Sequence, residues 1–482
     1  MIEIHNPNLA RTIPIEDMYK GKAFILGKGF TKPSMVFERD FDKMPNAHVA
    51  ITGTSGSGKT TLVLPLITYY ANLGKIVHVI DPKKDGMRTD GENLFLFTGR
   101  NSPYSVPVFE FDHHKENGGI HSEAKEIVRL LKKYYFPSAG EHQTGVLLQL
   151  IIDTYRMKGF MEEDDTTWDK GYDLNNRDEK REWLLTLPTM EDLFDNLLAL
   201  IEVCKFKEED DFGKFHTINK QKIERLQEQE ENDDKDNESK ILAVQETMIE
   251  TYKQYVNGLV RKGVERIKIA EDMFKDVSMD FYNDPKVQRA LDGLKLNLKL
   301  VVNSGVFGSK IPPVTRGVNR YDISGLPPET QCFITEIIAN KLDRSLRFRG
   351  EYLDLPKAYR DIRGAKYDNV LVIDEAQLVL PTGRDAKDST KGLIRIAAEG
   401  RGRGLALVLL TQSPNNIPEI MLRNIGTKII LKTEPVDTKS VCRLLGVNKT
   451  ELDRIYDTFG TCMLNVDKDY ETVALPWVKI RA

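Results

Sequence analysis

One short segment restricts the fold of this 482-residue chain more than any other. The residues Gly53-Thr-Ser-Gly-Ser-Gly58-Lys59-Thr60 follow an apolar run, His48–Thr52, and precede an apolar helical pattern, Thr61–Tyr69. They fit the G-x-x-x-x-G-K-[ST] pattern in the strand–loop–helix context that this pattern requires. Glycines let the backbone come close to phosphate oxygens, and the amide groups at the start of a helix attract the anion. The segment therefore predicts a phosphate-binding loop in an α/β fold.

The expected ligands of this loop are ATP and Mg²⁺. In such loops the lysine, here Lys59, reaches the β- and γ-phosphates, and the hydroxyl of the next residue, here Thr60, binds Mg²⁺. The other nucleotide-binding positions are expected to be the remaining loop residues and the next residue of the helix. These are Gly53, Thr54, Ser55, Gly56, Ser57, Gly58 and Thr61.

A second acidic element is expected to complete the site. The buried-strand pattern Asn369–Ile373 ends in Asp374 and Glu375. An aspartate at the carboxyl end of such a strand can bind the Mg²⁺ shell, and the following glutamate can orient and activate the attacking water. This glutamate favours hydrolysis over a simple nucleotide switch. The alternative is that the two carboxylates only cap the next helix.

A third apolar run, Leu405–Leu410, ends in Thr411 and Gln412. We expect this strand to lie between the acidic strand and the strand of the phosphate loop. A polar residue at its end, Gln412, can then contact the γ-phosphate or the attacking water. The alternative is a helix-capping Thr411 beside an exposed glutamine.

Two arginines, Arg401 and Arg403, stand among glycines just before that strand. Glycine disfavours a helix interior, so the arginines are expected to end a helix and point out of it. Arginine at such a place suits a subunit boundary, where it could stabilise the charge of a neighbour's γ-phosphate. The alternative is a favourable charge at the carboxyl end of the helix dipole.

The order of strand-like and helical patterns predicts an α/β domain that is interrupted by a helical insertion. Residues 1–45 have short β-like runs at 22–26 and 34–38, and apolar strands alternate with helices from His48 onward. From about Tyr155 to Lys295 the pattern is helical and highly charged; its stretch Lys205–Lys240 holds 8 Lys/Arg and 12 Asp/Glu. The expected parts are a β-rich segment 1–45, core 46–154, helical insertion 155–295 and core 296–482. Further strands are expected at 48–52, 75–80, 107–111, 296–302, 318–323, 369–373, 405–410 and 427–431.

Composition excludes several classes of protein. With 40% hydrophobic and 29% charged residues, the chain has enough apolar surface to fold. Because no apolar run approaches 18 residues and no signal-peptide pattern is visible, we expect no integral membrane segment and a cytoplasmic protein. The four cysteines stand far apart, which indicates reduced thiols. The net charge of −4 gives no global basic excess, so DNA contact would need a local patch.

Two further clusters have less specific patterns. Asp112-His113-His114 with His121 lacks the spacing of a metal site and is expected to be a surface loop. Asp81-Pro82-Lys83-Lys84 follows a strand, where its lysines could face nucleic acid or form a solvated turn.

The order of these motifs resembles the HerA/FtsK superfamily of ring-shaped P-loop ATPases, nearest to its HerA branch. The resemblance covers roughly residues 46–111 and 296–480. Asp374-Glu375-Ala-Gln377 stands where HerA-like proteins usually have Asp/Glu-Glu-Ala-His. The other matching blocks are the phosphate loop with its strand from His48, Ile80-Asp81-Pro82-Lys83, the segment from Val318 to Leu326, Glu399-Gly-Arg401 with Gly404, Thr411-Gln412-Ser-Pro, and Asn424-Ile-Gly-Thr427-Lys428.

The resemblance implies a RecA-like core that forms a hexameric ring and uses ATP to move or unwind double-stranded DNA. It also implies a nuclease or other effector as partner, in DNA processing or antiviral defence. The sequence departs from the superfamily in three ways. The N-terminal β-barrel of HerA proteins is truncated or absent, and the insertion is larger and more acidic than expected. The membrane anchors of FtsK and of conjugative coupling proteins are missing. A conjugation or type IV secretion ATPase, or an ATP-controlled scaffold that activates a partner enzyme, stays open as an alternative.

Overall fold

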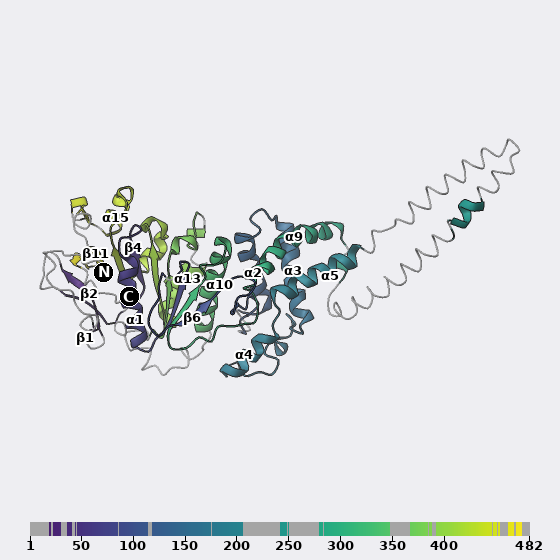
Figure 1. Ribbon diagram of the computed structural model, residues 1–482, viewed down its shortest axis with the longest axis horizontal. Helices are drawn as coiled ribbons and strands as arrows, with labels where there is room; N and C mark the ends of the chain where they lie inside the picture. Colours follow the sequence, from purple (N-terminus) through teal and green to yellow (C-terminus); the bar gives the residue numbers. More distant parts are fainter. Residues whose placement is uncertain are drawn as a thin grey trace. The chain divides into compact units, whose positions relative to one another are not determined.

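Figure 1 shows the computed structural model of the chain. Contacts divide the chain into two compact units, Met1–Val108 with Ser304–Ala482, and Phe109–Asn303. Much of the N-terminal segment 1–45 and the acidic residues 206–240 lie outside the described residues. The structure describes residues 19–20, 23–29, 36–40, 44, 46–84, 86–113, 118–174, 176–205, 242–247, 249, 279–282, 284–347, 367–383, 385–387, 392–445, 447–450, 452–453, 461–466 and 469–474.

Within these residues, the strands of the first unit form one 12-stranded sheet. Its order is β1-β2-β12-β11-β10-β4-β9-β8-β5-β7-β6, and β3 pairs with β2. The strands are β1 (Tyr19–Lys20), β2 (Ala23–Gly29), β3 (Val36–Asp40), β4 (Val49–Thr52), β5 (Ile76–Asp81), β6 (Asn93–Leu96), β7 (Gly317–Asp322), β8 (Asn369–Ile373), β9 (Leu405–Thr411), β10 (Thr427–Ile430), β11 (Thr461–Val466) and β12 (Asp469–Ala474).

The sheet is parallel from β10 through β4, β9, β8, β5 and β7 to β6. Every residue of β4, β8 and β9 is buried. Parallel strands with both faces covered consist of continuous apolar runs, because neither face meets water. Since all these strands run the same way, the residues that follow β4, β8 and β9 lie at one edge of the sheet.

One face of this parallel section packs against helix α1 (Lys59–Asn72). Leu66 and Tyr70 of α1 share a buried core with Val77 of β5, Val370 of β8 and Val408 of β9. Alternate strand residues point to the opposite face. The first unit also contains α10 (Pro328–Arg347), α13 (Gly392–Glu399), α14 (Glu419–Arg423) and α15 (Thr438–Leu445), with short 3₁₀ turns η3 (Ala376–Leu378), η4 (Asp385–Lys387), η5 (Gly400–Arg403), η6 (Pro414–Asn416) and η7 (Pro435–Asp437).

The other end of the sheet is antiparallel and joins the two ends of the chain. Strand β11 pairs with β10 and with β12, and β12 then pairs with β2. Of the N-terminal strands, β2 and β3 correspond to the β-like runs expected at 22–26 and 34–38, each shifted toward the carboxyl side. The C-terminal hairpin therefore connects the N-terminal strands to the parallel core.

Two expected strands are wrong. Residues 107–111 form no strand, and the neighbouring Val106 makes only an isolated bridge to Phe307. Pro107 has no amide hydrogen to give to a ladder, which explains the missing pairing. Residues 296–302 belong to helix α9 (Pro285–Asn303). The buried positions Leu294, Leu298 and Val301 continue a helical spacing that begins at Val287.

The second unit is helical. An aromatic cluster forms part of its core, where Phe111 contacts Tyr155, Phe160, Trp168 and Trp183 edge to face. Helix α2 packs against α3, which packs against α5 and α9, so this unit extends beyond the insertion expected at 155–295. The helices of this unit are α2 (Ile120–Tyr134), α3 (Glu141–Met157), η2 (Asp165–Thr167), α4 (Arg177–Thr186), α5 (Met190–Lys205), α8 (Met279–Tyr282) and α9.

Candidate nucleotide-binding and hydrolysis site

The phosphate loop lies between β4 and α1. The Gly53 amide donates to the Thr411 carbonyl at 3.2 Å, and the Thr54 amide donates to the Lys432 carbonyl at 2.8 Å. The loop is thus anchored to the ends of the two strands that flank β4. A Cβ on Gly53 would lie 2.5 Å from Ser57 Oγ and 2.8 Å from Leu431 Cβ, so this position requires glycine.

Lys59 is buried at the start of α1 and turns back onto the loop. Its Nζ donates to the carbonyls of Gly53 at 2.6 Å and Thr54 at 3.0 Å. Burial lowers the pKa of Lys59, while the nearby carboxylates of Glu375 and Asp374 oppose the shift. The ammonium group therefore lies inside the loop, where a phosphate group would need a cationic partner.

The loop residues fit a nucleotide with Mg²⁺. Gly56 and Gly58 have φ of 76° and 97°, and Gly58 is the N-cap residue of α1. In the described part of the chain the buried Ser57 Oγ has no hydrogen-bond partner, so it is available to a ligand. The Thr60 hydroxyl, from the first turn of α1, and the Asp374 carboxylate are oxygen donors of the kind that Mg²⁺ prefers.

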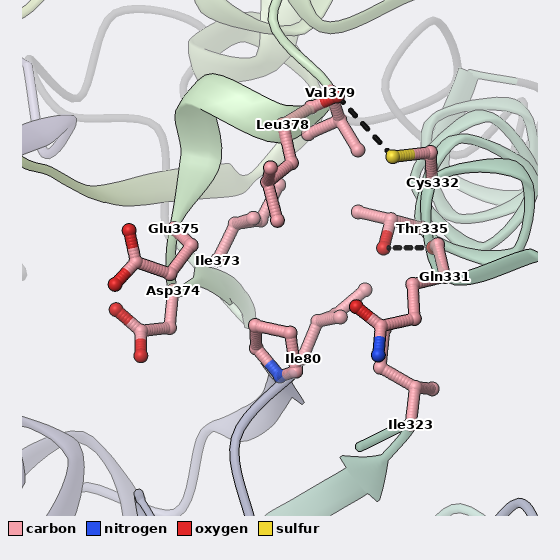
Figure 2. Close-up of a pocket in the computed structure, with 11 residues that line it drawn as sticks. Ile80, Ile323, Gln331, Cys332, Thr335, Ile373, Asp374, Glu375, Leu378 and Val379 are labelled. Carbon is pink, nitrogen blue, oxygen red and sulfur yellow. Dashed lines mark hydrogen bonds between the residues drawn. The ribbon is translucent and has the colours of Figure 1, made fainter. Parts of the chain in front are cut away.

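The acidic pair follows β8 directly. Figure 2 shows the Asp374 and Glu375 carboxyl groups directed to the same side, away from Cys332 of α10. Both residues are buried, and a small pocket behind them is lined by apolar side chains such as Ile80 and Ile373. Glu375 has left-handed backbone angles, φ 49° and ψ 43°, which cost energy for a residue other than glycine. Strand β8 ends at Ile373, and Glu375 in this conformation precedes the 3₁₀ turn η3.

Both oxygens of the Glu375 carboxylate have partners. Lys83 Nζ donates a short hydrogen bond to Oε1, while Oε2 accepts one from Gln377 Nε2 and one from Gln412 Nε2 at 3.1 Å. Burial opposes ionisation of this carboxyl, but the hydrogen bonds from Lys83 and the two glutamines lower the pKa of Glu375. Burial raises the pKa of Asp374, and the Lys83 charge opposes that shift. Glu375 is thus held as the anion that a general base must be.

Gln412 lies beside Glu375 because β9 runs between β4 and β8. The structure therefore brings together Lys59 of the loop, the acidic pair and Gln412 at one edge of the sheet. It does not bring Arg403 to them: its guanidinium pairs with Asp343 of α10 and with Glu399. The Arg401 side chain lies outside the described residues.

Lys83 is a site residue that the sequence did not assign to the acidic pair, since Lys83 and Lys84 were expected to face nucleic acid or to form a solvated turn. Its Nζ lies 3.5 Å from Asp374 Oδ2 in addition to the contact with Glu375. Strand β5 pairs with β8, so the residues after both strands meet at the same edge. The available signal was a lysine just beyond the carboxyl end of a parallel strand, where ligands of open α/β sheets bind.

The other clusters belong to different surroundings. His113 stacks on Phe111 and meets the Trp183 ring edge to face. His114 lies outside the described residues. Across the part of the chain that is described, no group of three His, Cys, Asp or Glu residues could hold a metal ion. Likewise, no described helix is long and apolar enough to cross a membrane.

Comparison with curated proteins finds relatives along part of the chain. It is 35% identical over 138 residues to the DNA double-strand break repair helicase HerA of Sulfolobus acidocaldarius, covering 28% of this chain and 26% of the relative. It is 36% identical over 126 residues to the protein of the same name in Sulfurisphaera tokodaii, covering 26% and 23%. The matches thus span about a quarter of each relative. No protein-family profile matches the chain.

Among solved structures, VirB4 of Thermoanaerobacter pseudethanolicus is similar over 95% of this chain and 97% of its own, with a TM-score of 0.59 and 12% identity. At this identity the likeness concerns the fold. Together with the sheet order, it confirms the expected RecA-like P-loop core with a mainly parallel sheet.

Proposed function

We propose that this chain, which is a P-loop ATPase of the HerA/FtsK superfamily nearest to the HerA branch, couples ATP hydrolysis to the movement or unwinding of double-stranded DNA. The observation that carries the proposal is the meeting of three elements at one edge of the sheet. They are the loop after β4, the acidic pair after β8 and Gln412 after β9. A chain that only binds nucleotide has no need of an ionised, hydrogen-bonded glutamate beside the loop.

The chemical roles follow from the contacts. Lys59 would exchange its loop carbonyls for the β- and γ-phosphates, and Thr60 with Asp374 would hold Mg²⁺. When bound, Mg²⁺ would neutralise part of the phosphate charge. Glu375 would accept a proton from the attacking water, and Gln412 would orient the carboxylate or that water. The remaining loop residues would surround the phosphates with amide groups.

The proposal extends to assembly and partners. We infer a cytoplasmic homo-oligomeric ring, a hexamer, in which Arg401 or Arg403 completes the site of the adjacent subunit. The effector partner would be a nuclease or another DNA-processing or antiviral enzyme. Support for these statements comes from the motif order and from the HerA relatives, which are named as DNA double-strand break repair helicases.

The test measures steady-state ATP hydrolysis with no DNA, with linear duplex DNA and with single-stranded DNA. We expect stimulation by duplex DNA, together with displacement of a triplex-forming strand from a duplex by the wild-type protein and not by Glu375→Gln. ATP hydrolysis without duplex stimulation or strand displacement would contradict DNA translocation, and stimulation by a secretion complex would then favour the transport ATPase.

A further inference from the structure

Lys83 contacts both carboxylates of the acidic pair, yet the proposed chemistry does not use it. We propose that Lys83 is the resident counter-ion of Asp374 and Glu375 and a positioning residue for Glu375. It neutralises both carboxylates when no metal is bound, and it would remain paired with Glu375 if Asp374 held Mg²⁺. This inference rests on the ATP site of the proposed function and is independent of DNA.

The turn that carries Lys83 is built to fix its position. Asp81, fully buried at the end of β5, accepts a hydrogen bond from the Lys83 amide on Oδ1 and one from the Met87 amide on Oδ2, both at 3.0 Å. The buried guanidinium of Arg320, on β7, donates to the same Oδ2 at 3.2 Å. Lys83 therefore starts from an anchored backbone, unlike a lysine on a solvated turn.

The turn is also tightly closed. A Cβ on Gly86 would lie 3.0 Å from Asp81 Oδ1 and 3.2 Å from Lys83 Cβ, so the chain wraps closely around the aspartate. The Lys83 side chain remains 51% exposed, however, so its ammonium group can move and still be solvated by water. An anchored backbone and a mobile ammonium group would let Lys83 exchange one carboxylate partner for another.

The two contacts of Lys83 are unequal. Lys83 Nζ donates a hydrogen bond to Glu375 Oε1, whereas it lies 3.5 Å from Asp374 Oδ2. Asp374 is the carboxylate expected to bind Mg²⁺, and a divalent ion and an ammonium group compete for the same oxygens. The weaker contact is therefore the one that metal binding must break. Glu375 keeps Lys83 and remains an ionised base.

The geometry also separates the two lysines of the site. Lys59 donates its hydrogen bonds to the carbonyls of Gly53 and Thr54 and interacts with the two carboxylates through charge alone, whereas Lys83 contacts them directly. Removing the Lys83 charge would leave two adjacent buried carboxylates without their direct cationic partner. Such a pair attracts a divalent ion more strongly and holds Glu375 less well.

The experiment compares Lys83→Met and Lys83→Gln with Lys83→Arg, using Lys84→Met on the neighbouring exposed lysine as the matched control. The probe is Mn²⁺, titrated into nucleotide-free protein and followed by electron paramagnetic resonance. Binding that disappears in Asp374→Asn is assigned to this site. We expect Lys83→Met and Lys83→Gln to bind Mn²⁺ up to about fivefold more tightly, the range of a half-exposed ion pair.

Without DNA, the same two variants should lose roughly ten- to a hundredfold in kcat, part of the contribution of a general base. The KM for ATP should change little, and Lys83→Arg should restore most of the turnover. Wild-type Mn²⁺ affinity in both neutral variants, or wild-type kcat, would overturn the proposal. Because no DNA is present, failure here is distinct from failure of duplex stimulation.

Discussion

At Glu375 the backbone adopts left-handed angles while both carboxylate oxygens hold hydrogen bonds. Strain of this kind persists where the surroundings fix a side chain for a purpose. We expect Glu375→Gln to bind ATP normally and to lose roughly 10²–10⁴-fold in kcat, since an amide keeps the shape without the basicity.

Lys59→Ala should instead weaken ATP binding at least about tenfold, because a charged hydrogen-bond partner is lost. Fluorescent-nucleotide titration and steady-state turnover separate the two, and near-normal turnover of Glu375→Gln would remove it from the base role.

The buried His78 should make the free energy of unfolding depend on pH. Burial lowers the pKa of His78 from 6.5 to about 4, although a hydrogen bond involving Asn369 opposes the shift. Between pH 6.5 and about pH 4, His78 is protonated in the unfolded chain but neutral in the folded protein. The free energy of unfolding therefore falls as the pH is lowered through this range. We expect the free energy of unfolding to drop by about 2 kcal/mol between pH 7 and pH 5 on account of His78.

Urea denaturation at the two pH values measures this effect. His78→Gln should be less pH-dependent by that amount, whereas His142→Gln, on the exposed side of α3, should behave as wild type. Equal pH dependence in all three proteins would show that His78 is not the group responsible.

At the scale of elements, the phosphate loop depends on its close approach to the ends of β9 and β10. A methyl group at position 53 would overlap Ser57 Oγ and Leu431 Cβ, and overpacking of this kind costs about 1–3 kcal/mol. The short loop is easier to displace than the buried strands. Gly53→Ala should therefore lower ATP affinity by roughly tenfold or more with an unchanged circular dichroism spectrum. Gly145→Ala, in α3 with no atom within 4 Å of the added carbon, is the control and should bind ATP normally.

Some strands and site residues were predictable from the sequence, and others were not. The strands that became β4, β8, β9 and β10 were predictable because parallel strands buried on both faces are continuous apolar runs. Residues 296–302 were wrongly predicted as a strand because Leu296, Leu298 and Leu300 alternate with polar residues. They lie in helix α9, whose buried residues follow a helical spacing that begins at Val287. Lys83 could not be assigned because its partners depend on the pairing of β5 with β8, and strand order is a property of the whole sheet. Gln412 was expected at the site because its strand could be placed between two others.

At the scale of the whole molecule, the proposed ring predicts that subunits share active sites. Arg401→Ala is the sharper variant, because Arg403 already pairs with Asp343 and Glu399 of its own chain. An arginine supplied in trans contributes about 10³–10⁵ in rate, so Arg401→Ala should lower turnover at least about a hundredfold while ATP binding persists. Mixing it with Glu375→Gln should restore partial activity, since some interfaces then combine both wild-type residues. Mixed rings that form and stay inactive, or a fully active monomer, would contradict a shared site.

The strand order also has a consequence for synthesis on the ribosome. The strand that leads into the phosphate loop, β4, is made early, but its neighbours β9 and β10 begin only at Leu405 and Thr427. Strand β5 likewise has no partner until β7 and β8 are made, and β2, which can pair early with β1 and β3, joins the rest of the sheet only through β12. A nascent chain that ends before Leu405 exposes unpaired apolar strands, the condition under which large proteins aggregate or recruit chaperones. The nucleotide site is therefore assembled late in translation, and a ribosome that stalls after the second unit has emerged leaves a chain that cannot bind ATP.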